Sequence, residues 1–421
     1  MKAGTSQICI TPPDAIDLTG FGGRPQPHQG VHDDLYMRGL CLEQSGERLL
    51  WLHCDLLGLD TELVRQVRSA ICAQRPVLPR QVLISATHTH AGPATQRLRG
   101  CGEMNAEYMA ALAVNLLDAA RTAIDTMQDA SLWFGEGRCV LGTDRRTRWY
   151  GPKNACVDHT LPVLAFKRPD GSLLAVVSNY AMHNVGAGQG NRLISADISG
   201  AAAETLHREL PGRPVVLCTN AAAGNVDPPA LADDFSAVER FGAILAADIR
   251  AALPSLSPAT DTTLSSTMTT MHLPVQKMSR EEVIASCSQE VAGGGDKLMQ
   301  EEWRDHTLRL LDAGRAPDHV EIDLQAVRIG PARFAAIPAE VFCRMTLALR
   351  ELCGPHTYVV GYANGNIGYL PFAEIYDEGG YEPAVSYKVY GNFNLARNAF
   401  ALVRDVAAAQ LSNLNAAATP G

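Results

Sequence analysis

Two histidines, separated by one threonine, follow an apolar stretch near residue 85. In "QVLISATHTHAGP" (81–93) the first residues have the composition of a buried strand, and His88 and His90 come directly after it. Alternate residues of an extended chain point to the same side, so both imidazoles could face one zinc ion. They could equally be hydrogen-bonded histidines that cap the strand.

His183 occurs in the same setting, after the apolar run "LLAVVSNYAM" and before the small residues of "NVGAGQGN". Its recurrence favours a metal site shared with His88, although a single histidine at a strand end is more often structural. Asp55, at the end of "LLWLHCD", could orient an imidazole or cap the following turn.

Residues in two other loops could act on a substrate. Asp227, in "NAAAGNVDPP" (220–229), could be a general base or a carboxylate linked to the metal, and small residues beside Asn225 would let a ligand approach. An Asx-turn ended by proline explains the same residues. Arg145, in the basic "TDRRTRW", could clamp a carboxylate or carbonyl, or simply be solvated.

Three further residues carry no local signal of function. Glu340 comes at the expected start of the helix "AEVFCRMTLALREL", where an acidic residue interacts favourably with the helix dipole. Tyr369, in "NGNIGYLPF", and Tyr381, in "GGYEP", lie in predicted loops, where aromatic residues normally serve packing.

The elements that carry these residues alternate between strands and helices, which predicts an α/β fold with mixed or largely parallel sheets. Four of the apolar runs end in loops of small and polar residues, which predicts one site at the carboxyl ends of the strands. The predicted strands are 48–57, 81–88, 161–166, 173–183, 213–220 and 357–365, and the predicted helices include 60–73 (N-cap Asp60), 105–124 (behind Asn105) and 236–253.

We expect a single domain over residues 1–412 and a flexible tail over 413–421. A more charged segment at about 278–316, with two helical stretches around "AGGGD", is interpreted as a surface insertion that could serve as a lid. Residues 319–340 predict a hairpin, and no internal repeat is visible.

The net charge of −9 provides no basic surface for nucleic acid. No apolar stretch is long enough for a membrane span, and the N-terminus lacks the apolar core of a secretory signal. The eleven cysteines are scattered without a CxxC pair, as expected of reduced thiols. We therefore predict a cytoplasmic protein that acts on a small molecule, and a homo-oligomer is compatible with the sequence.

These residues, in this order, resemble the neutral ceramidase family, whose catalytic domain is a zinc-dependent amidase. "SATHTHAGP" is similar to the histidine motif of that family, and "HNVGAGQGNRLISADISG" to its second histidine segment. "ICITPPDA", "LTGFGGR" and "GVHDDLYMRGLCLE" resemble its N-terminal signature. The similarity continues through "IPAE" to "NGNIGYLPFAEIYDEGGYEP", so it covers roughly residues 3–400.

The resemblance implies a zinc site and the residues around it. The implied zinc ligands are His88, His183, Glu340 and Tyr369. The same resemblance places His90 and Arg145 at the substrate and has Tyr381 line the pocket beside the metal.

Two features differ from the family pattern. The catalytic serine of ceramidases lies in a Gly-Asp-Val-Ser-Pro context, which is "GNVDP" here, so Asn225 replaces the aspartate and Asp227 replaces the serine. The chain also ends near residue 421, which predicts a relative with the catalytic domain alone and a polar substrate in place of ceramide.

The sequence therefore predicts a zinc-dependent hydrolase that cleaves an amide, or less readily an ester or lactone, with a metal-activated water. Asp227 would orient or deprotonate this water, and Asn225 and Tyr381 would contact the substrate. Two alternatives remain open: a zinc-dependent lyase or isomerase that acts through an enolate, and a catalytically silent binding protein.

Overall fold

The computed structural model describes residues 1–287 and 297–416. Its core consists of three units in which helices and strands follow the same order. Each unit has three antiparallel strands, a helix, a fourth strand parallel to the third, and a second helix. The sequence shows no internal repeat, so the repetition lies in the topology and not in the residues.

The units follow one another along the chain. The first comprises β1 (Lys2–Cys9), β2 (Tyr36–Gln44), β3 (Glu47–Cys54), α1 (Thr61–Gln74), β4 (Val82–Ala86) and α2 (Ala106–Asp125). The second comprises β6 (Ser131–Arg138), β8 (Thr160–Lys167), β9 (Leu173–Tyr180), α4 (Asp197–Glu209), β10 (Val215–Asn220) and α5 (Ser236–Ala252). The third comprises β13 (Leu264–Pro274), β14 (His319–Ile329), β15 (Ala332–Ala336), α8 (Arg344–Cys353), β17 (Thr357–Val360) and α12 (Ala399–Ala416).

The predicted α/β fold is confirmed. The sheets were expected to be mixed or largely parallel, and they are mixed. Strands joined by tight turns are antiparallel, as at Ser45 and Gly46, whose φ values of 51° and 83° suit a two-residue hairpin. A parallel pair forms only where a helix crosses over, as α1 does between β3 and β4. The expected N-caps are also present, because the side chains of Asp60 and Asn105 accept backbone N–H bonds at the starts of α1 and α2.

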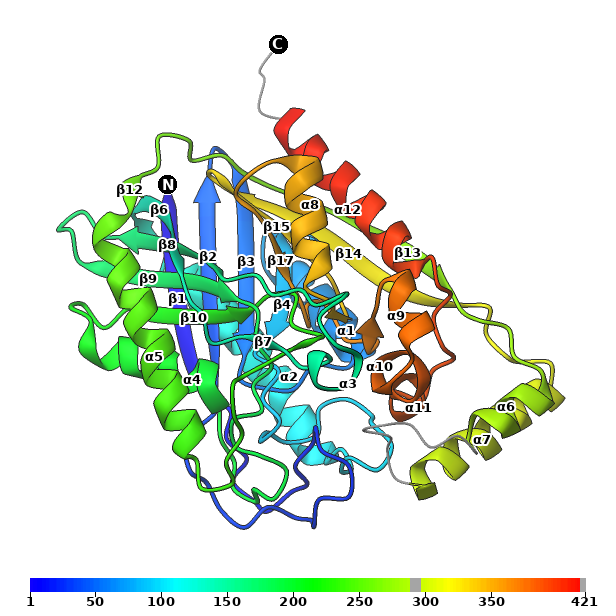
Figure 1. Ribbon diagram of the computed structural model, residues 1–421. Coiled ribbons are helices and arrows are strands. Elements are labelled where there is room, and N and C mark those ends of the chain that lie inside the picture. Colours follow the sequence, from blue (N-terminus) through cyan, green and yellow to red (C-terminus); the bar gives the residue numbers. More distant parts are fainter. Residues whose placement is uncertain (288–296, 417–421) are drawn as a thin grey trace.

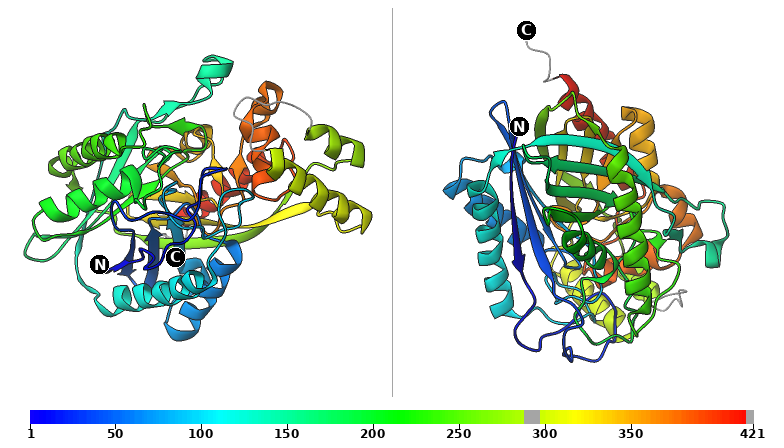
Figure 2. Two further views of the ribbon diagram at one scale, coloured as in Figure 1. Left: turned by 90° about the horizontal axis from the view of Figure 1, so that it is seen from below. Right: turned by 90° about the vertical axis from the view of Figure 1, so that its left-hand side faces the viewer.

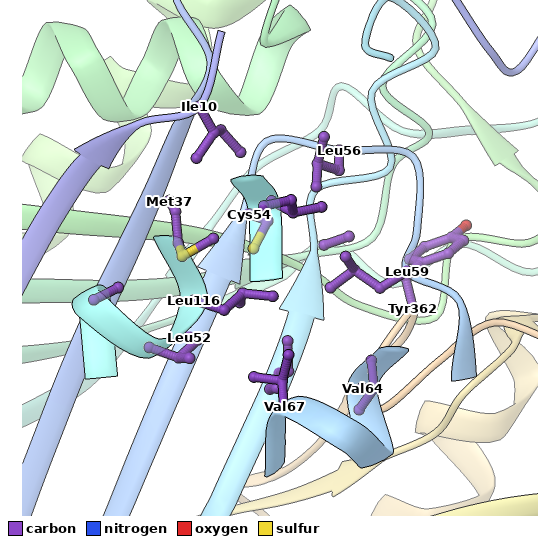
Figure 3. Packing of buried hydrophobic residues seen from close by; sticks show 14 of the residues in the cluster. Ile10, Met37, Leu52, Cys54, Leu56, Leu59, Val64, Val67, Leu116 and Tyr362 are labelled. Atoms are coloured by element: carbon purple, nitrogen blue, oxygen red, sulfur yellow. The ribbon is translucent and has the colours of Figure 1, made fainter. Parts of the chain in front are cut away.

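The three sheets pack on one another through a shared inner core, and each outer face is covered by the helices of its own unit. In the inner core Trp51 of the first sheet contacts Phe334 of the third, with ring centroids 5.6 Å apart. Figure 3 shows an outer layer, where Leu52 of β3 packs with Val64 of α1 and Leu116 of α2. The pairs α4/α5 and α8/α12 lie on other sides of the molecule (Figure 1; Figure 2).

Short elements connect the units and complete the sheet edges. The strands are β5 (Gln128–Asp129), β7 (Thr143–Asp144), β11 (Val226–Asp227), β12 (Ser257–Pro258), β16 (Glu340–Val341) and β18 (Tyr369–Leu370). The helices are α3 (Thr147–Tyr150), α9 (Ala373–Glu378), α10 (Tyr381–Ala384), α11 (Ser386–Val389) and the 3-10 turns Pro79–Gln81 and Leu253–Ser255. No helix in residues 1–287 or 297–416 is long and apolar enough to cross a membrane.

The predicted insertion forms two helices, α6 (Arg280–Ser286) and α7 (Lys297–Asp312), at one edge of the molecule (Figure 1). The residues "AGGGD", around which the two helical stretches were predicted, lie outside the described residues. Trp303 of α7 is fully buried and packs edge-on against Tyr387 of α11, so these helices are anchored to the body. At the C-terminus α12 continues to Ala416, so the first part of the predicted tail is helical, and residues 417–421 lie outside the described residues.

The shared core predicts that the three units unfold together. We expect Phe334→Ala to lower the free energy of unfolding by about 3–5 kcal/mol, because it opens a cavity between sheets. Urea denaturation followed by circular dichroism and by tryptophan fluorescence should show one coincident transition. Leu352→Ala, on an exposed position of α8, is the control and should change little. Two separate transitions would contradict the shared core.

Candidate metal centre

The site lies where the three parallel strand pairs end. The loops after β4, β9, β10, β15 and β17 supply polar side chains to one cavity of about 460 Å³. Its lining includes the predicted site residues His88, His90, Arg145, His183, Asp227, Glu340, Tyr369 and Tyr381. Carboxyl ends of parallel strands are where open α/β sheets bind ligands, so the topology explains this convergence.

His88 is held by its own backbone conformation. Its φ of 67° is left-handed, so the backbone at His88 is not extended. The prediction that His88 and His90 point to the same side assumed an extended backbone. That argument was therefore wrong in its geometry, although both imidazoles reach the cavity. The Nδ1 atom of His88 lies 2.7 Å from the carbonyl oxygen of Leu57, and the ring stacks on Tyr362 with centroids 3.9 Å apart.

His183 is fixed in a similar way by the neighbouring loop. Its Nδ1 atom lies 2.8 Å from the carbonyl oxygen of Ala223, and its backbone N–H donates to the carbonyl of Val226. Both histidines are buried. An Nδ1–H that donates to a carbonyl fixes the tautomer of each neutral ring, so the lone pair of Nε2 faces the cavity.

Glu340 and Tyr369 are brought together by strand pairing. Glu340 does not open a helix as predicted: it lies in β16, which pairs in parallel with β18, and its direct partner is Tyr369. The helix α8 begins only at Arg344 because pairing holds the preceding residues extended. Two residues that are weak signals in the sequence therefore become neighbours in the site.

The donor set fits a cation. Glu340 Oε2 lies 3.2 Å from His88 Nε2 and 3.1 Å from His183 Nε2, and the Tyr369 hydroxyl lies 3.4 Å from the latter. Ligands about 2.0–2.1 Å from a tetrahedral zinc ion lie roughly 3.3–3.4 Å apart, close to these separations. Two imidazole nitrogens and a carboxylate oxygen meet here, so a proton or a bound cation between them offsets the repulsion of their lone pairs.

The protonation states agree with this interpretation. Burial lowers the pKa of His88, which keeps its imidazole neutral at neutral pH. Burial opposes ionisation of Glu340, but His88 and His183 in their charged forms favour the carboxylate and hold its pKa well below the usual range, a role that a bound cation would take over. Neutral imidazoles and an ionised carboxylate are the forms that bind divalent cations.

His90 differs from the other two histidines. The three rings form a group whose nitrogens lie within 4.8 Å of one another, and such a group could hold a metal ion. His90 Nε2 lies 3.2 Å from His88 Nε2, but its Nδ1 atom is buried with no partner among the described residues. Metal-binding histidines almost always donate their second nitrogen, so His90 is the least suited of the three to be a ligand. Burial, then His88 and His183, hold the pKa of His90 well below its usual value.

Arg145 connects the metal centre to two carboxylates. Its Nη2 atom donates to the Tyr369 hydroxyl at 2.9 Å, and it forms ion pairs with Glu382 at 2.9 Å and Asp227 at 3.4 Å. Asp227 is placed beside it because β11 pairs with β7, the strand that leads into Arg145. Glu382, which sequence reasoning missed, also bonds Arg146.

Tyr381 and Asn225 have different positions. Tyr381 lines the cavity and packs edge-on against Tyr369, with centroids 5.8 Å apart. Asn225 is not among the lining residues: its Nδ2 donates to Asp144 at 2.6 Å and its Oδ1 accepts the N–H of Cys343 at 2.8 Å. The structure therefore does not bring Asn225 to a substrate, because its amide joins the two loops that carry Arg145 and Glu340.

Two further residues support the ligands without a signal in the sequence. The Tyr390 hydroxyl donates to Glu340 Oε1 at 2.6 Å and accepts from Asn366 at 3.0 Å, so Oε2 is left to face the histidines. Tyr362 stacks on His88. Asp55, for which two roles were open, takes neither: it pairs with Arg38 at 2.7 Å in the buried core.

The comparisons with known proteins agree with this geometry. A family model described as neutral/alkaline non-lysosomal ceramidase, N-terminal, matches residues 2–233. The chain belongs to this family. Neutral ceramidase of Pseudomonas aeruginosa is 24% identical over 232 residues, which are 51% of this chain and 34% of the relative. Neutral ceramidase of Drosophila melanogaster is 24% identical over 235 residues, which are 50% and 33% of the two chains.

The sequence match thus spans about a third of the length of these relatives. The fold match is wider. The crystal structure of neutral ceramidase from Pseudomonas aeruginosa aligns with a TM-score of 0.78 at 18% identity and covers 100% of this chain and 75% of that one. The structure described as ceramidase complexed with C2 aligns with a TM-score of 0.80 at 18% identity and covers 99% of this chain and 75% of that one. The ceramidase-like fold is therefore present across the chain.

We expect the protein to bind one equivalent of zinc and the double variant His88→Ala/His183→Ala to lose it, because two of the converging donors are removed. Metal content after dialysis, measured by inductively coupled plasma mass spectrometry, tests this. His272→Ala/His319→Ala removes two exposed histidines of β13 and β14 and should keep the metal. A full equivalent of zinc in the first double variant would refute the ligand assignment.

Tyr390→Phe should weaken metal affinity by about 10–100-fold, because Glu340 loses the bond that orients its carboxylate. Competition with a chromophoric chelator measures this affinity directly. Tyr376→Phe is the matched control, since Tyr376 bonds a backbone carbonyl away from the cavity. Equal affinities in the two variants would show that Tyr390 has no orienting role.

Proposed function

We propose that this member of the ceramidase family is a zinc-dependent hydrolase that cleaves an amide bond of a small molecule. The observation that carries the proposal is the convergence of His88 Nε2, His183 Nε2 and Glu340 Oε2 at separations near 3.2 Å inside a cavity. Tyr369 completes the proposed ligand set. Nitrogen and oxygen donors in fourfold arrangement suit zinc.

A zinc ion bound there would lower the pKa of a water molecule towards about 7 and polarise a carbonyl group. The protein contributes the remaining steps. Asp227 stands where the ceramidase pattern has its serine, so water is the simplest nucleophile. The Asp227 carboxylate lines the cavity and is held by Arg145, which lets it accept a proton from water.

We assign His90 to the stabilisation of the developing oxyanion. Its ring lines the cavity, and burial, then His88 and His183, lower its pKa and keep the imidazole neutral. A neutral imidazole carries one N–H, which His90 would donate as a hydrogen bond to the developing oxyanion. The proton that Asp227 takes from water would then pass to the leaving nitrogen. In the balanced reaction the hydroxyl of water joins the acyl carbon, the C–N bond breaks, and the proton goes to the amine.

Arg145 acts as a positioning residue in this proposal. Its guanidinium contacts Tyr369, Asp227 and Glu382 together, so it fixes a proposed ligand and the proposed base relative to each other. With Glu382 along its edge, little of the guanidinium is left for a substrate carboxylate. This modifies the expectation that Arg145 would clamp the substrate.

A panel of N-acyl p-nitroanilides, assayed with zinc-loaded protein in ¹⁸O-labelled water, tests the reaction class. We expect release of p-nitroaniline and one labelled oxygen in the acid, and we expect Asp227→Asn to lower kcat by about 10²–10⁴-fold because the proton acceptor is lost. Asp405→Asn, on an exposed position of α12, is the control.

The isotope separates hydrolysis from the enolate alternative, because an isomerase puts no solvent oxygen into its product. Turnover without label, or full activity of Asp227→Asn, would contradict the proposed mechanism. Zinc binding without turnover of any amide, ester or lactone would favour the catalytically silent alternative.

A further inference from the structure

One cation in the cavity wall lacks a carboxylate partner. Arg99 lines the same cavity as the metal centre and is partly buried. The one hydrogen bond that its side chain makes among the described residues is long, 3.5 Å from Nη1 to the carbonyl oxygen of Lys388. Within the parts of the chain that the structure describes, no carboxylate lies within 4 Å of its guanidinium.

The other charged groups of the wall are already matched. Arg145 is paired with Asp227 and Glu382, and Glu340 faces the histidines at the proposed metal position. Arg99 therefore adds a positive charge that no lining carboxylate neutralises. A bound divalent cation would increase this excess, although the chain as a whole carries a net charge of −9.

Partial burial makes this arrangement costly for the free protein. Burial, and then the neighbouring Arg97, lower the pKa of Arg99, and the carboxylate of Glu302 only partly opposes this shift. A partly desolvated guanidinium without an ion pair is stabilised when an anion binds to it. Because Arg99 lies in the cavity wall, a ligand in the cavity can reach it.

The wall beside Arg99 is apolar. Leu98 and Cys101, which flank it in the chain, belong to a buried cluster with Leu57, Met299 and Val389, and all of these line the cavity. Met299 comes from α7, so the inserted helices take part in the cavity wall and do not merely cover the surface. A ligand that reaches Arg99 from the metal centre therefore contacts apolar side chains.

We propose that the substrate is an amide with a short apolar arm that ends in a carboxylate, and that Arg99 binds this carboxylate. The inference rests on the proposed function for the scissile bond, because the amide carbonyl is taken to lie at the metal centre. The cavity of about 460 Å³ is in the range that encloses small molecules. Arg99 is then a specificity-determining residue. It recognises the charged end of the substrate, whereas the groups at the metal centre act on the amide end.

Binding of reaction-product analogues tests the anion site without turnover. Linear dicarboxylates from succinate to suberate are compared with monocarboxylates of equal chain length by isothermal titration calorimetry on zinc-loaded protein. We expect at least one dicarboxylate to bind about tenfold or more tightly than its monocarboxylate partner, because a charge-assisted bidentate bond is added. Arg99→Gln should abolish the difference, and Arg99→Lys should restore part of it.

Arg97→Gln is the matched control. Arg97 is an exposed arginine two residues away that does not line the cavity, so this variant should keep the preference. The inference is overturned if dicarboxylates and monocarboxylates bind equally to the wild-type protein. It is also overturned if Arg99→Gln and Arg97→Gln reduce the preference by the same factor.

Kinetics with monoamides of the same dicarboxylic acids separate this inference from the proposed function. We expect Arg99→Gln to lower kcat/KM for glutaryl-p-nitroanilide about tenfold or more and to leave valeryl-p-nitroanilide within about twofold. If neither compound is hydrolysed but the binding preference depends on Arg99, the proposed reaction fails and the anion site stands. If both are hydrolysed without a preference in either assay, the reaction stands and the anion site fails.

Discussion

Two imidazole nitrogens and one carboxylate oxygen are held close together in one cavity, and this arrangement governs the rest of the site. The carbonyl oxygens of Leu57 and Ala223 fix the outer nitrogens of His88 and His183, so the inner nitrogens cannot both turn away. Tyr390 holds the outer oxygen of Glu340 in the same manner. Each ligand is thus oriented from behind by a neutral hydrogen bond, which is the usual support of a metal site.

The threefold repetition of one topology explains how the donors come together. Every unit places one parallel strand pair with its carboxyl ends towards the cavity, and the three units share an inner core of large side chains such as Trp51 and Phe334. Because interiors are close-packed, this core fixes the distances between loops that belong to different units. The candidate metal centre therefore draws on all three units, with His88 from the first, His183 from the second and Glu340 from the third.

The polar residues that are not ligands fall into two groups with different electrostatics. Arg145, Asp227 and Glu382 form a network in which charges neutralise one another, as expected of groups that hold a base and a ligand in place. Arg99 stands apart, because no carboxylate of residues 1–287 or 297–416 lies within 4 Å of its guanidinium. Asp227, which stands where the family pattern has its serine, belongs to the first group. The position that departs from the ceramidase pattern is therefore paired with Arg145 in this network.

The sequence by itself determined the local features of this protein. The apolar runs, the N-caps Asp60 and Asn105, and the histidine motif all depend on neighbours in the chain, and the structure has them where they were expected. The ligand-like position of Glu340 and Tyr369 came only from resemblance, since neither residue has a local signal.

Tertiary structure alone decided which groups meet. The pairing of β16 with β18 places Glu340 beside Tyr369, the left-handed backbone of His88 turns its ring, and the amide of Asn225 is used between two loops. Only the structure shows that Tyr390 bonds Glu340 and that the guanidinium of Arg99 makes just one long hydrogen bond among the described residues. These outcomes depend on contacts between residues far apart in the chain, and such contacts leave no periodicity or spacing to detect.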